Sequence, residues 1–214
     1  WSESPNPYFQ AYSNFDIVAY NDDNAEGIFQ PWQVIYRQIF YANQIIDNMN
    51  EKGYDLFEDK DEALSILAQA HFLRGVSYWY LAGTFGKGPL MVSSTGNGEI
   101  IMQEEIYQQA LSDFLEAEND LPDSWPASDL GRPTRGSVEG MKARIYAQLA
   151  GYYARPTVND PARSAEYWQL SLISLEDILD MPYNLAPDYK DNFLMTNENN
   201  HESLFDHQLR EGLY

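Results

Sequence analysis

Hydrophobic residues in this chain recur every three to four positions over several long segments, which are separated by stretches rich in proline, glycine, asparagine and aspartate. This is the spacing of a helix with one buried face, because a helix completes a turn in about 3.6 residues. We expect any sheet to be short or absent. The pattern predicts helices at about 31–50, 60–85, 103–120, 135–154 and 161–181.

The segment at about 60–85 is predicted to be the central helix. Its apolar face, which we expect to be buried, carries Ile66, Ala70, Leu73, Val76 and Tyr80. Small side chains recur on a neighbouring face at Ala68, Gly75 and Ala82, where a second helix can approach closely. Gly86 can take the left-handed conformation that closes a helix, and Pro89 cannot continue it, so the helix should end there.

A basic residue, Arg74, lies in the middle of this helix beside positions that should be buried. We predict that its stem packs in the core and that its guanidinium meets a carboxylate or the carbonyl groups of a helix end. Its predicted role is structural.

Helical hairpins are predicted to begin near residues 31, 103 and 161. Pro31 fits a first helical turn, Thr134 can cap the next-to-last helix, and Asp160 can cap the last. Alternating helices with small residues at their crossings are typical of tetratricopeptide-like arrays. We therefore predict an all-α fold of tetratricopeptide-like stacked helical hairpins with long loops. The single unit, 1–214, would comprise an aromatic loop region at 1–30, a hairpin core at 31–181 and an irregular segment at 182–214.

The composition is that of a folded chain with a strong acidic excess. Of 214 residues, 44% are hydrophobic and 14% aromatic, and 33 acidic against 13 basic residues give a formal charge of −20. This charge repels phosphate backbones, so we expect no nucleic-acid partner. The absence of cysteine excludes disulfides and thiolate metal sites but leaves the compartment open.

The chain as given carries no targeting segment. Trp1 and the residues after it provide neither a basic start nor an apolar signal core, and no apolar run approaches the roughly 20 residues that span a bilayer. Because the first residue is not methionine, we expect this chain to be part of a longer protein.

Motifs that carry chemistry elsewhere are incomplete here. The run Gly131-Arg132-Pro133-Thr134-Arg135-Gly136 lacks the Gly-Lys-Ser/Thr of a phosphate-binding loop, so we interpret Gly131 and Arg132 as structural residues of a turn. The three histidines, at 71, 201 and 207, show no metal-ligand spacing. No nucleophile or dinucleotide-binding motif occurs. We expect no catalytic residue, no metal and no cofactor.

Aromatic residues in the predicted loops are the candidates for ligand binding. Sugar rings stack on flat aromatic side chains and their hydroxyl groups need donors and acceptors, so a glycan site combines both. Residues 1–30 offer this mixture, with Trp1, Tyr8 and Tyr12 as the stacking surface and Asn21, Asp22, Asp23 and Asn24 as polar partners. The same acidic run could hold calcium, although a solvated turn is favoured. Trp125 and Asp129 form a second candidate site.

Five motifs, in order along the chain, resemble those of the SusD/RagB family of surface glycan-binding lipoproteins of Bacteroidetes. The central one is Gln69-Ala70-His71-Phe72-Leu73-Arg74-Gly75 with Tyr78-Trp79-Tyr80-Leu81 and Phe85-Gly86-Lys87-Gly88-Pro89-Leu90. The others are Trp32 to Asp47, Ile106 to Pro122, Gly131 to Tyr146, and Glu202 to Gln208.

The resemblance implies a tetratricopeptide-like scaffold on the extracellular face of the outer membrane, anchored through a lipidated cysteine outside this chain. Such a protein binds oligosaccharide or polysaccharide without cleaving it and delivers it to a SusC-like TonB-dependent transporter. Two other classes stay open: a tetratricopeptide-type scaffold that binds peptides, and an all-helical glycoside-processing enzyme. The enzyme would need two carboxylates either about 5 Å or about 6.5–9.5 Å apart across a cleft, which a sequence does not display.

Overall fold

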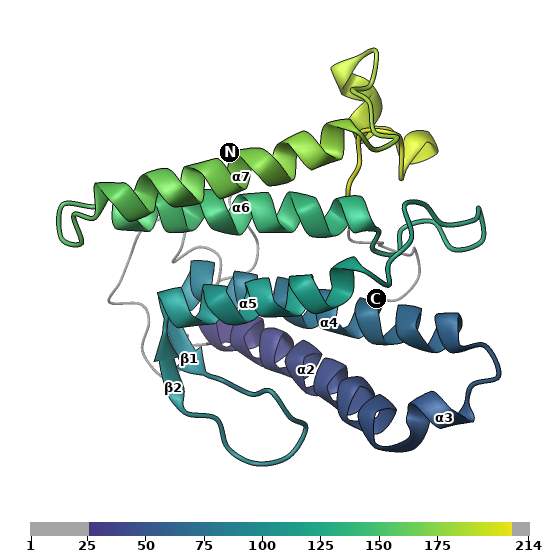
Figure 1. The fold of residues 1–214 in the computed structure, drawn as a ribbon, viewed down its shortest axis with the longest axis horizontal. Coiled ribbons are helices and arrows are strands. Elements are labelled where there is room, and N and C mark those ends of the chain that lie inside the picture. The colour runs from purple at the N-terminus through teal and green to yellow at the C-terminus, as the bar shows by residue number, and fades with distance from the viewer. Residues whose placement is uncertain (1–25, 207–214) are drawn as a thin grey trace.

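The computed structural model describes residues 26–206, which form a helical fold (Figure 1). The predicted helices are present, at Glu26–Asn48 (α2), Lys60–Phe85 (α4), Gln103–Glu118 (α5), Arg135–Tyr153 (α6) and Pro161–Leu179 (α7). The shorter elements are Met49–Gly53 (η2, a π-helical turn), Tyr54–Leu56 (α3), and two 3-10 turns at Tyr189–Phe193 (η3) and Met195–Asn197 (η4). The prediction of an all-α fold is confirmed.

Neighbouring helices run in opposite directions, as in stacked hairpins (Figure 1). Helix α4 packs against α2 and α5, α5 contacts α6, and α6 lies along α7. Two short strands, Lys87–Pro89 (β1) and Ile100–Met102 (β2), pair antiparallel at one end of the helices. At the opposite end lie the turn that precedes α4, the segment 119–134 and the residues after α7. Segments far apart in the sequence therefore meet there.

The first helix begins earlier than predicted. It starts at Glu26, so residues 26–30 are helical and Pro31 lies inside the helix instead of in its first turn. Proline has the φ angle of a helix, but inside one its missing N–H removes an intrahelical hydrogen bond and its ring crowds the carbonyl group four residues earlier. At Pro31 this cost does not end the helix. The boundary predicted between a loop at 1–30 and a core at 31–181 is therefore too late, because residues 26–30 already belong to α2.

The other helix ends follow their local signals. Asp59 accepts hydrogen bonds from the N–H groups of Asp61 and Glu62 at the start of α4, and Thr134 and Asp160 accept from backbone N–H groups at the starts of α6 and α7. Gly86 closes α4 with a φ of 70°, the left-handed conformation predicted for it. Pro89 ends β1, and its carbonyl oxygen accepts from the Tyr36 hydroxyl at 2.8 Å.

The predicted buried face of α4 is only partly correct. Ala70 and Val76 are buried, but Leu73 and Tyr80 are 47% and 39% exposed. Because α4 contacts α2 on one side and α5 on another, its buried surface is wider than one stripe and lies partly elsewhere, at Phe72, Tyr78 and Leu81.

The small-residue face of α4 is buried as predicted, at Ala68, Gly75 and Ala82. A Cβ atom on Gly75 would lie 2.8 Å from the Phe114 ring and 3.1 Å from the Ala110 carbonyl oxygen of α5. The absence of a side chain at Gly75 therefore sets how closely α4 and α5 approach.

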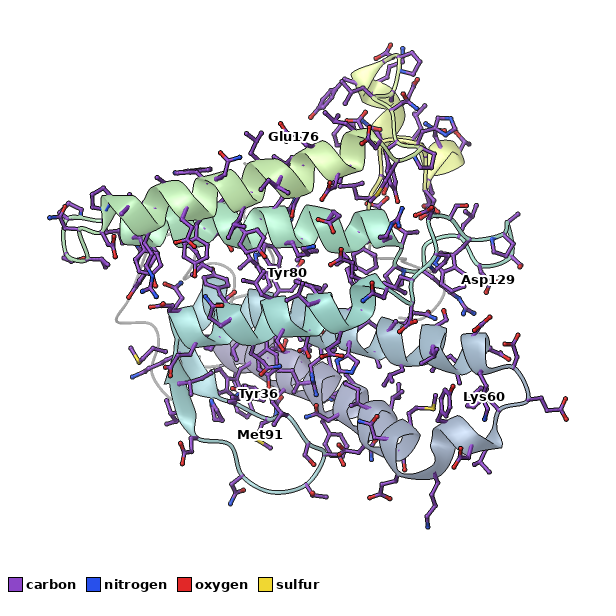
Figure 2. All side chains as sticks on the ribbon, in the orientation of Figure 1. Tyr36, Lys60, Tyr80, Met91, Asp129 and Glu176 are labelled. Carbon is purple, nitrogen blue, oxygen red and sulfur yellow. The ribbon has the colours of Figure 1, made fainter. Side chains whose placement is uncertain are left out.

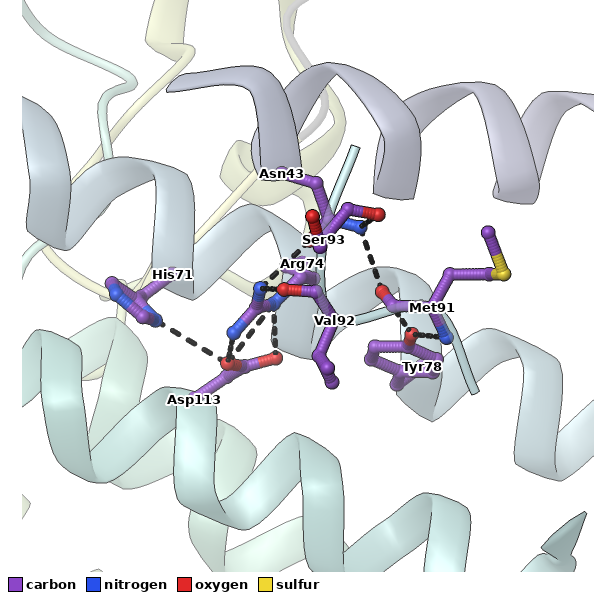
Figure 3. A network of polar contacts seen from close by, with 8 residues as sticks. All are labelled: Asn43, His71, Arg74, Tyr78, Met91, Val92, Ser93 and Asp113. Carbon is purple, nitrogen blue, oxygen red and sulfur yellow. Dashed lines mark hydrogen bonds and ion pairs between the residues drawn. The ribbon is translucent and has the colours of Figure 1, made fainter. Parts of the chain in front are cut away.

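A buried polar network around Arg74 joins three helices (Figure 3). The guanidinium donates to both carboxylate oxygens of Asp113, with Nη2 to Oδ1 at 2.5 Å and Nε to Oδ2 at 3.0 Å. Its Nη1 donates to Asn43 Oδ1 at 2.7 Å, and Asn43 Nδ2 donates to the carbonyl oxygens of Met91 and Ser93. The prediction that Arg74 meets a carboxylate is confirmed, and the network ties α2, α4 and α5 to the segment after β1.

Tyr78 extends this network on α4. Its hydroxyl donates to the Met91 carbonyl oxygen at 2.7 Å and accepts from the Met91 N–H at 2.8 Å. Burial raises the pKa of Tyr78 to about 12, so the phenol keeps its proton at neutral pH. Among the helices of residues 26–206, none has the length and apolar character needed to cross a membrane.

Candidate functional site

The segment 119–134, which connects α5 to α6, carries the predicted pair Trp125 and Asp129. Gly131 turns the chain with a φ of 93°, a conformation that favours glycine, and the Arg135 N–H closes the segment on the Pro122 carbonyl oxygen at 3.0 Å. The indole N–H of Trp125 donates to the Pro133 carbonyl oxygen at 2.8 Å. The tryptophan ring is therefore held in place by the backbone that leads into α6.

The structure brings Trp125 and Asp129 together through Arg132. The Arg132 guanidinium lies over the indole, 5.3 Å from the ring centroid, and its Nη2 pairs with Asp129 Oδ1 at 2.6 Å. The Ser128 hydroxyl donates to the other carboxylate oxygen of Asp129 at 2.8 Å. Because Arg132 occupies one position over the ring, the remaining indole surface is what a ligand could contact. Figure 2 shows Asp129 at the same end of the molecule as Lys60, the first residue of α4.

Two hollows open beside this segment, and both are lined by Trp125 and Arg132. The large hollow, of about 780 Å³, lies between the start of α4, the end of α5 and the segment itself. Its polar lining consists of Asp59, Asp61, Glu62, Ser65, Gln69, Asn119, Asp120, Asp129 and Arg132. This mixture of an aromatic ring, amides and carboxylates suits a ligand with a flat apolar face and many hydroxyl groups.

The small hollow, of about 140 Å³, lies between the same segment and the residues after α7. Tyr183 lines it, and the Tyr183 and Thr134 hydroxyls share a hydrogen bond at 2.7 Å. The wall after α7 is held by Glu202, whose carboxylate accepts from the Ala186 N–H at 2.8 Å. Hydrogen bonds from the Asn192 side chain and from Ala186 lower the pKa of Glu202, which stays ionised near neutral pH.

The first predicted site lies outside the residues that the structure describes. This applies to Trp1, Tyr8, Tyr12, Asn21, Asp22, Asp23 and Asn24, and with them to the calcium hypothesis. Within residues 26–206, no group of three or more histidine, aspartate or glutamate side chains is placed to hold a metal ion.

An aromatic groove of about 490 Å³ between α4, α6 and α7 was not predicted. Trp79 and Tyr80 line it from α4 and Trp168 from α7, where Trp168 is 53% exposed. Arg144 lies 5.4 Å from the Trp79 ring centroid, and the Trp79 indole donates to Gln148 Oε1 at 2.8 Å. The sequence of α7 carries a signal for this groove, because small and large side chains recur on separate faces of the helix. The small residues, Ser164, Ser171 and Ser174, are buried, and the large apolar residues are exposed, at Trp168, Leu172, Leu175 and Leu179.

Comparison with known proteins identifies a matching family and structures of the same fold. A family model described as "Starch-binding associating with outer membrane", of the SusD-like group, matches residues 5–147. A crystal structure with xylogluco-oligosaccharide aligns with 94% of this chain and 38% of its own, at a TM-score of 0.74 and 21% identity. A laminarin-binding SusD-like protein aligns with 95% of this chain and 41% of its own, at a TM-score of 0.73 and 21% identity. These likenesses show a shared fold.

Sequence relatives agree. A SusD-like protein of Formosa agariphila is 24% identical over 200 residues, which are 91% of this chain and 34% of the relative. The starch-binding protein SusD of Bacteroides thetaiotaomicron is 25% identical over 158 residues, which are 71% of this chain and 27% of the relative. The chain spans about a third of the length of the curated relatives it matches.

Proposed function

Because this chain belongs to the SusD-like family of starch-binding proteins associated with the outer membrane, we propose that it binds an oligosaccharide or polysaccharide without cleaving it. The observation that carries the proposal is the Trp125 ring, which the Pro133 carbonyl oxygen fixes at the edge of two hollows with polar linings. The names of relatives that bind starch, laminarin and a xylogluco-oligosaccharide support a glycan as the ligand.

The proposed binding combines stacking with hydrogen bonds. The apolar C–H face of one sugar ring would contact the indole of Trp125, while its hydroxyl groups meet the side chains around the ring. Asp129 accepts hydrogen bonds and Arg132 donates them, and the ion pair between the two already sets their positions. A binding site whose groups are held before the ligand arrives loses less conformational entropy on binding.

We place the protein on the extracellular face of the outer membrane, held by a lipid anchor outside this chain, with a SusC-like TonB-dependent transporter as its partner. The description of the matched family supports association with the outer membrane. Binding without hydrolysis agrees with delivery, because a protein that cut its cargo would compete with its own transporter.

A glycan array followed by a reducing-sugar assay on the glycans that bind tests this proposal. We expect at least one oligosaccharide to bind and no release of reducing ends above the level of a blank. Sustained release would identify a glycoside-processing enzyme instead. Binding of peptides on a parallel peptide array, with no glycan bound, would identify a tetratricopeptide-type scaffold.

A further inference from the structure

The large hollow beside Trp125 has an excess of negative charge, and from it we infer which class of glycan the site accepts. Five carboxylates line the hollow, at Asp59, Asp61, Glu62, Asp120 and Asp129, against a single guanidinium, that of Arg132. We infer that the site takes neutral oligosaccharides and rejects those that carry uronate or sulfate groups. This inference rests on the proposed function and adds the chemical class of its ligand.

The one positive charge in the lining is already engaged. Arg132 pairs with Asp129 at 2.6 Å and lies over the Trp125 ring, so its positive charge is already largely compensated within the lining. The remaining carboxylates of the lining have no cationic neighbour within it. An anion entering the hollow therefore meets net repulsion.

The helix ends that open onto the hollow do not change this balance. A helix N-terminus ordinarily attracts anions through its free N–H groups. At the start of α4, however, Asp59 already accepts from the N–H groups of Asp61 at 2.9 Å and Glu62 at 3.3 Å. Helix α5 ends at Glu118, beside Asn119 and Asp120 of the lining, so its negative end offsets the positive end of α4.

The lining nevertheless suits neutral hydroxyl groups. Carboxylates accept hydrogen bonds, and a sugar hydroxyl donates them, whereas an ionised uronate or sulfate group has no proton to donate. With the indole of Trp125 beside it, the hollow offers acceptors and an apolar surface instead of cations.

The expected discrimination follows from Coulomb's law. A charge about 8 Å from one carboxylate in water meets a repulsion that lowers affinity about twofold. For the net excess of carboxylates in the lining, the combined effect is on the order of tenfold at low salt. Because the charges are solvent-exposed, the discrimination should shrink as added salt shortens the screening length, which is about 8 Å at 0.15 M and shorter still at 300 mM.

The test compares laminarihexaose with the same hexaose in which one glucose is oxidised at C6 to glucuronate, which exchanges one hydroxymethyl group for a carboxylate. The affinity of the full chain for each is measured by calorimetry in 20 mM and 300 mM salt. The lining variant is Asp61→Asn/Glu62→Gln/Asp120→Asn, which spares the cap at Asp59 and the ion pair of Asp129. The control makes the same change in charge on exposed positions of α7, as Glu166→Gln/Glu176→Gln/Asp177→Asn.

We expect the natural chain to prefer the neutral hexaose about tenfold at low salt, the lining variant to lose most of that preference, and the control to keep it. Equal affinity for both ligands, or the same preference in the lining and control variants, would overturn the inference. If neither hexaose binds, the comparison is made with the tightest neutral glycan of the array and its oxidised form. If the chain binds only acidic glycans, the inferred selection for neutral glycans is wrong and the proposed glycan binding stands. If the chain binds no glycan, both the inference and the proposed function are wrong.

Discussion

Replacing Arg74 with methionine should destabilise the chain strongly, because it removes the main partner of the buried Asp113 carboxylate and leaves it only His71 Nδ1, at 3.3 Å. Asp113 is 1% exposed and accepts hydrogen bonds from Nε and Nη2 of Arg74, so Arg74→Met removes the guanidinium that makes the shortest contacts with it. Asn43 Oδ1 and the Val92 carbonyl oxygen lose their donor as well. Methionine fills part of the space of the arginine stem, so the loss of charge pairing dominates.

The magnitude follows from the burial of the pair. Removing one partner of a buried ion pair typically costs about 3–5 kcal/mol, a large part of the roughly 5–15 kcal/mol that stabilises a domain. Replacing both partners with apolar residues is often close to neutral, because no uncompensated charge remains. Arg74→Met/Asp113→Leu should therefore recover most of the stability that Arg74→Met loses.

The assay is urea unfolding followed by far-ultraviolet circular dichroism, with the free energy of unfolding extrapolated to water. The double-mutant cycle compares the natural chain, Arg74→Met, Asp113→Leu and the double variant, and it isolates the coupling energy between Arg74 and Asp113. A loss below about 1 kcal/mol in Arg74→Met would refute the reasoning. A double variant as unstable as the sum of its singles would also refute it, because the two residues would then act independently.

Two further substitutions test the packing and the charges of the core by the same unfolding assay. Gly75→Ala should lower the free energy of unfolding by about 1 kcal/mol or more, because its Cβ would overlap the Phe114 ring. Gly151→Ala in α6 has no atom within 4 Å of the added carbon and should raise the free energy of unfolding by up to about 1 kcal/mol. A gain at both sites would contradict the close approach of α4 and α5. Burial raises the pKa of Glu139, which pairs with Lys142 at 2.8 Å, above the ordinary 4.5. The contribution of Glu139 to the free energy of unfolding is therefore present at acid pH and is lost as the pH rises through the pKa of the folded state. Glu139→Gln should thus gain stability relative to the natural chain from about pH 4 to pH 8, and a relative loss would show that the carboxylate is instead stabilised by Lys142.

Helix positions could be predicted because their signals are local. The caps at Thr134 and Asp160 and the left-handed Gly86 depend on residues within a few positions, and the structure shows each of them. Pro31 misled the prediction for the same reason: a proline is compatible both with a first turn and, at the loss of one hydrogen bond, with a position further inside.

Burial on α4 could not be predicted from one stripe. Which side of a helix is covered depends on how many neighbours it has, and Leu73 and Tyr80 are exposed because α2 and α5 cover other sides of α4. The exposed apolar side of α7, with Trp168, was missed because apolar periodicity was taken to mean burial.

The candidate site was predictable only in its local part. Trp125 and Asp129 belong to one short segment, so their proximity follows from the chain itself, and Arg132 joins them from the same segment. The large hollow also needs residues of α4 such as Glu62 and Gln69, more than fifty positions earlier. No local pattern indicates that these residues face Trp125, because the packing of α4 against α5 brings them there.

The central claim, that Trp125 contacts the glycan, is tested most directly by calorimetric titration of the array's tightest glycan into Trp125→Ala. Trp168→Ala is the matched control, because it removes an exposed tryptophan of the aromatic groove on α7. With circular dichroism unchanged, we expect Trp125→Ala to weaken binding at least about fivefold, or about 1 kcal/mol, and Trp168→Ala to leave it within about twofold. Full affinity in Trp125→Ala, or a loss confined to Trp168→Ala, would contradict the account.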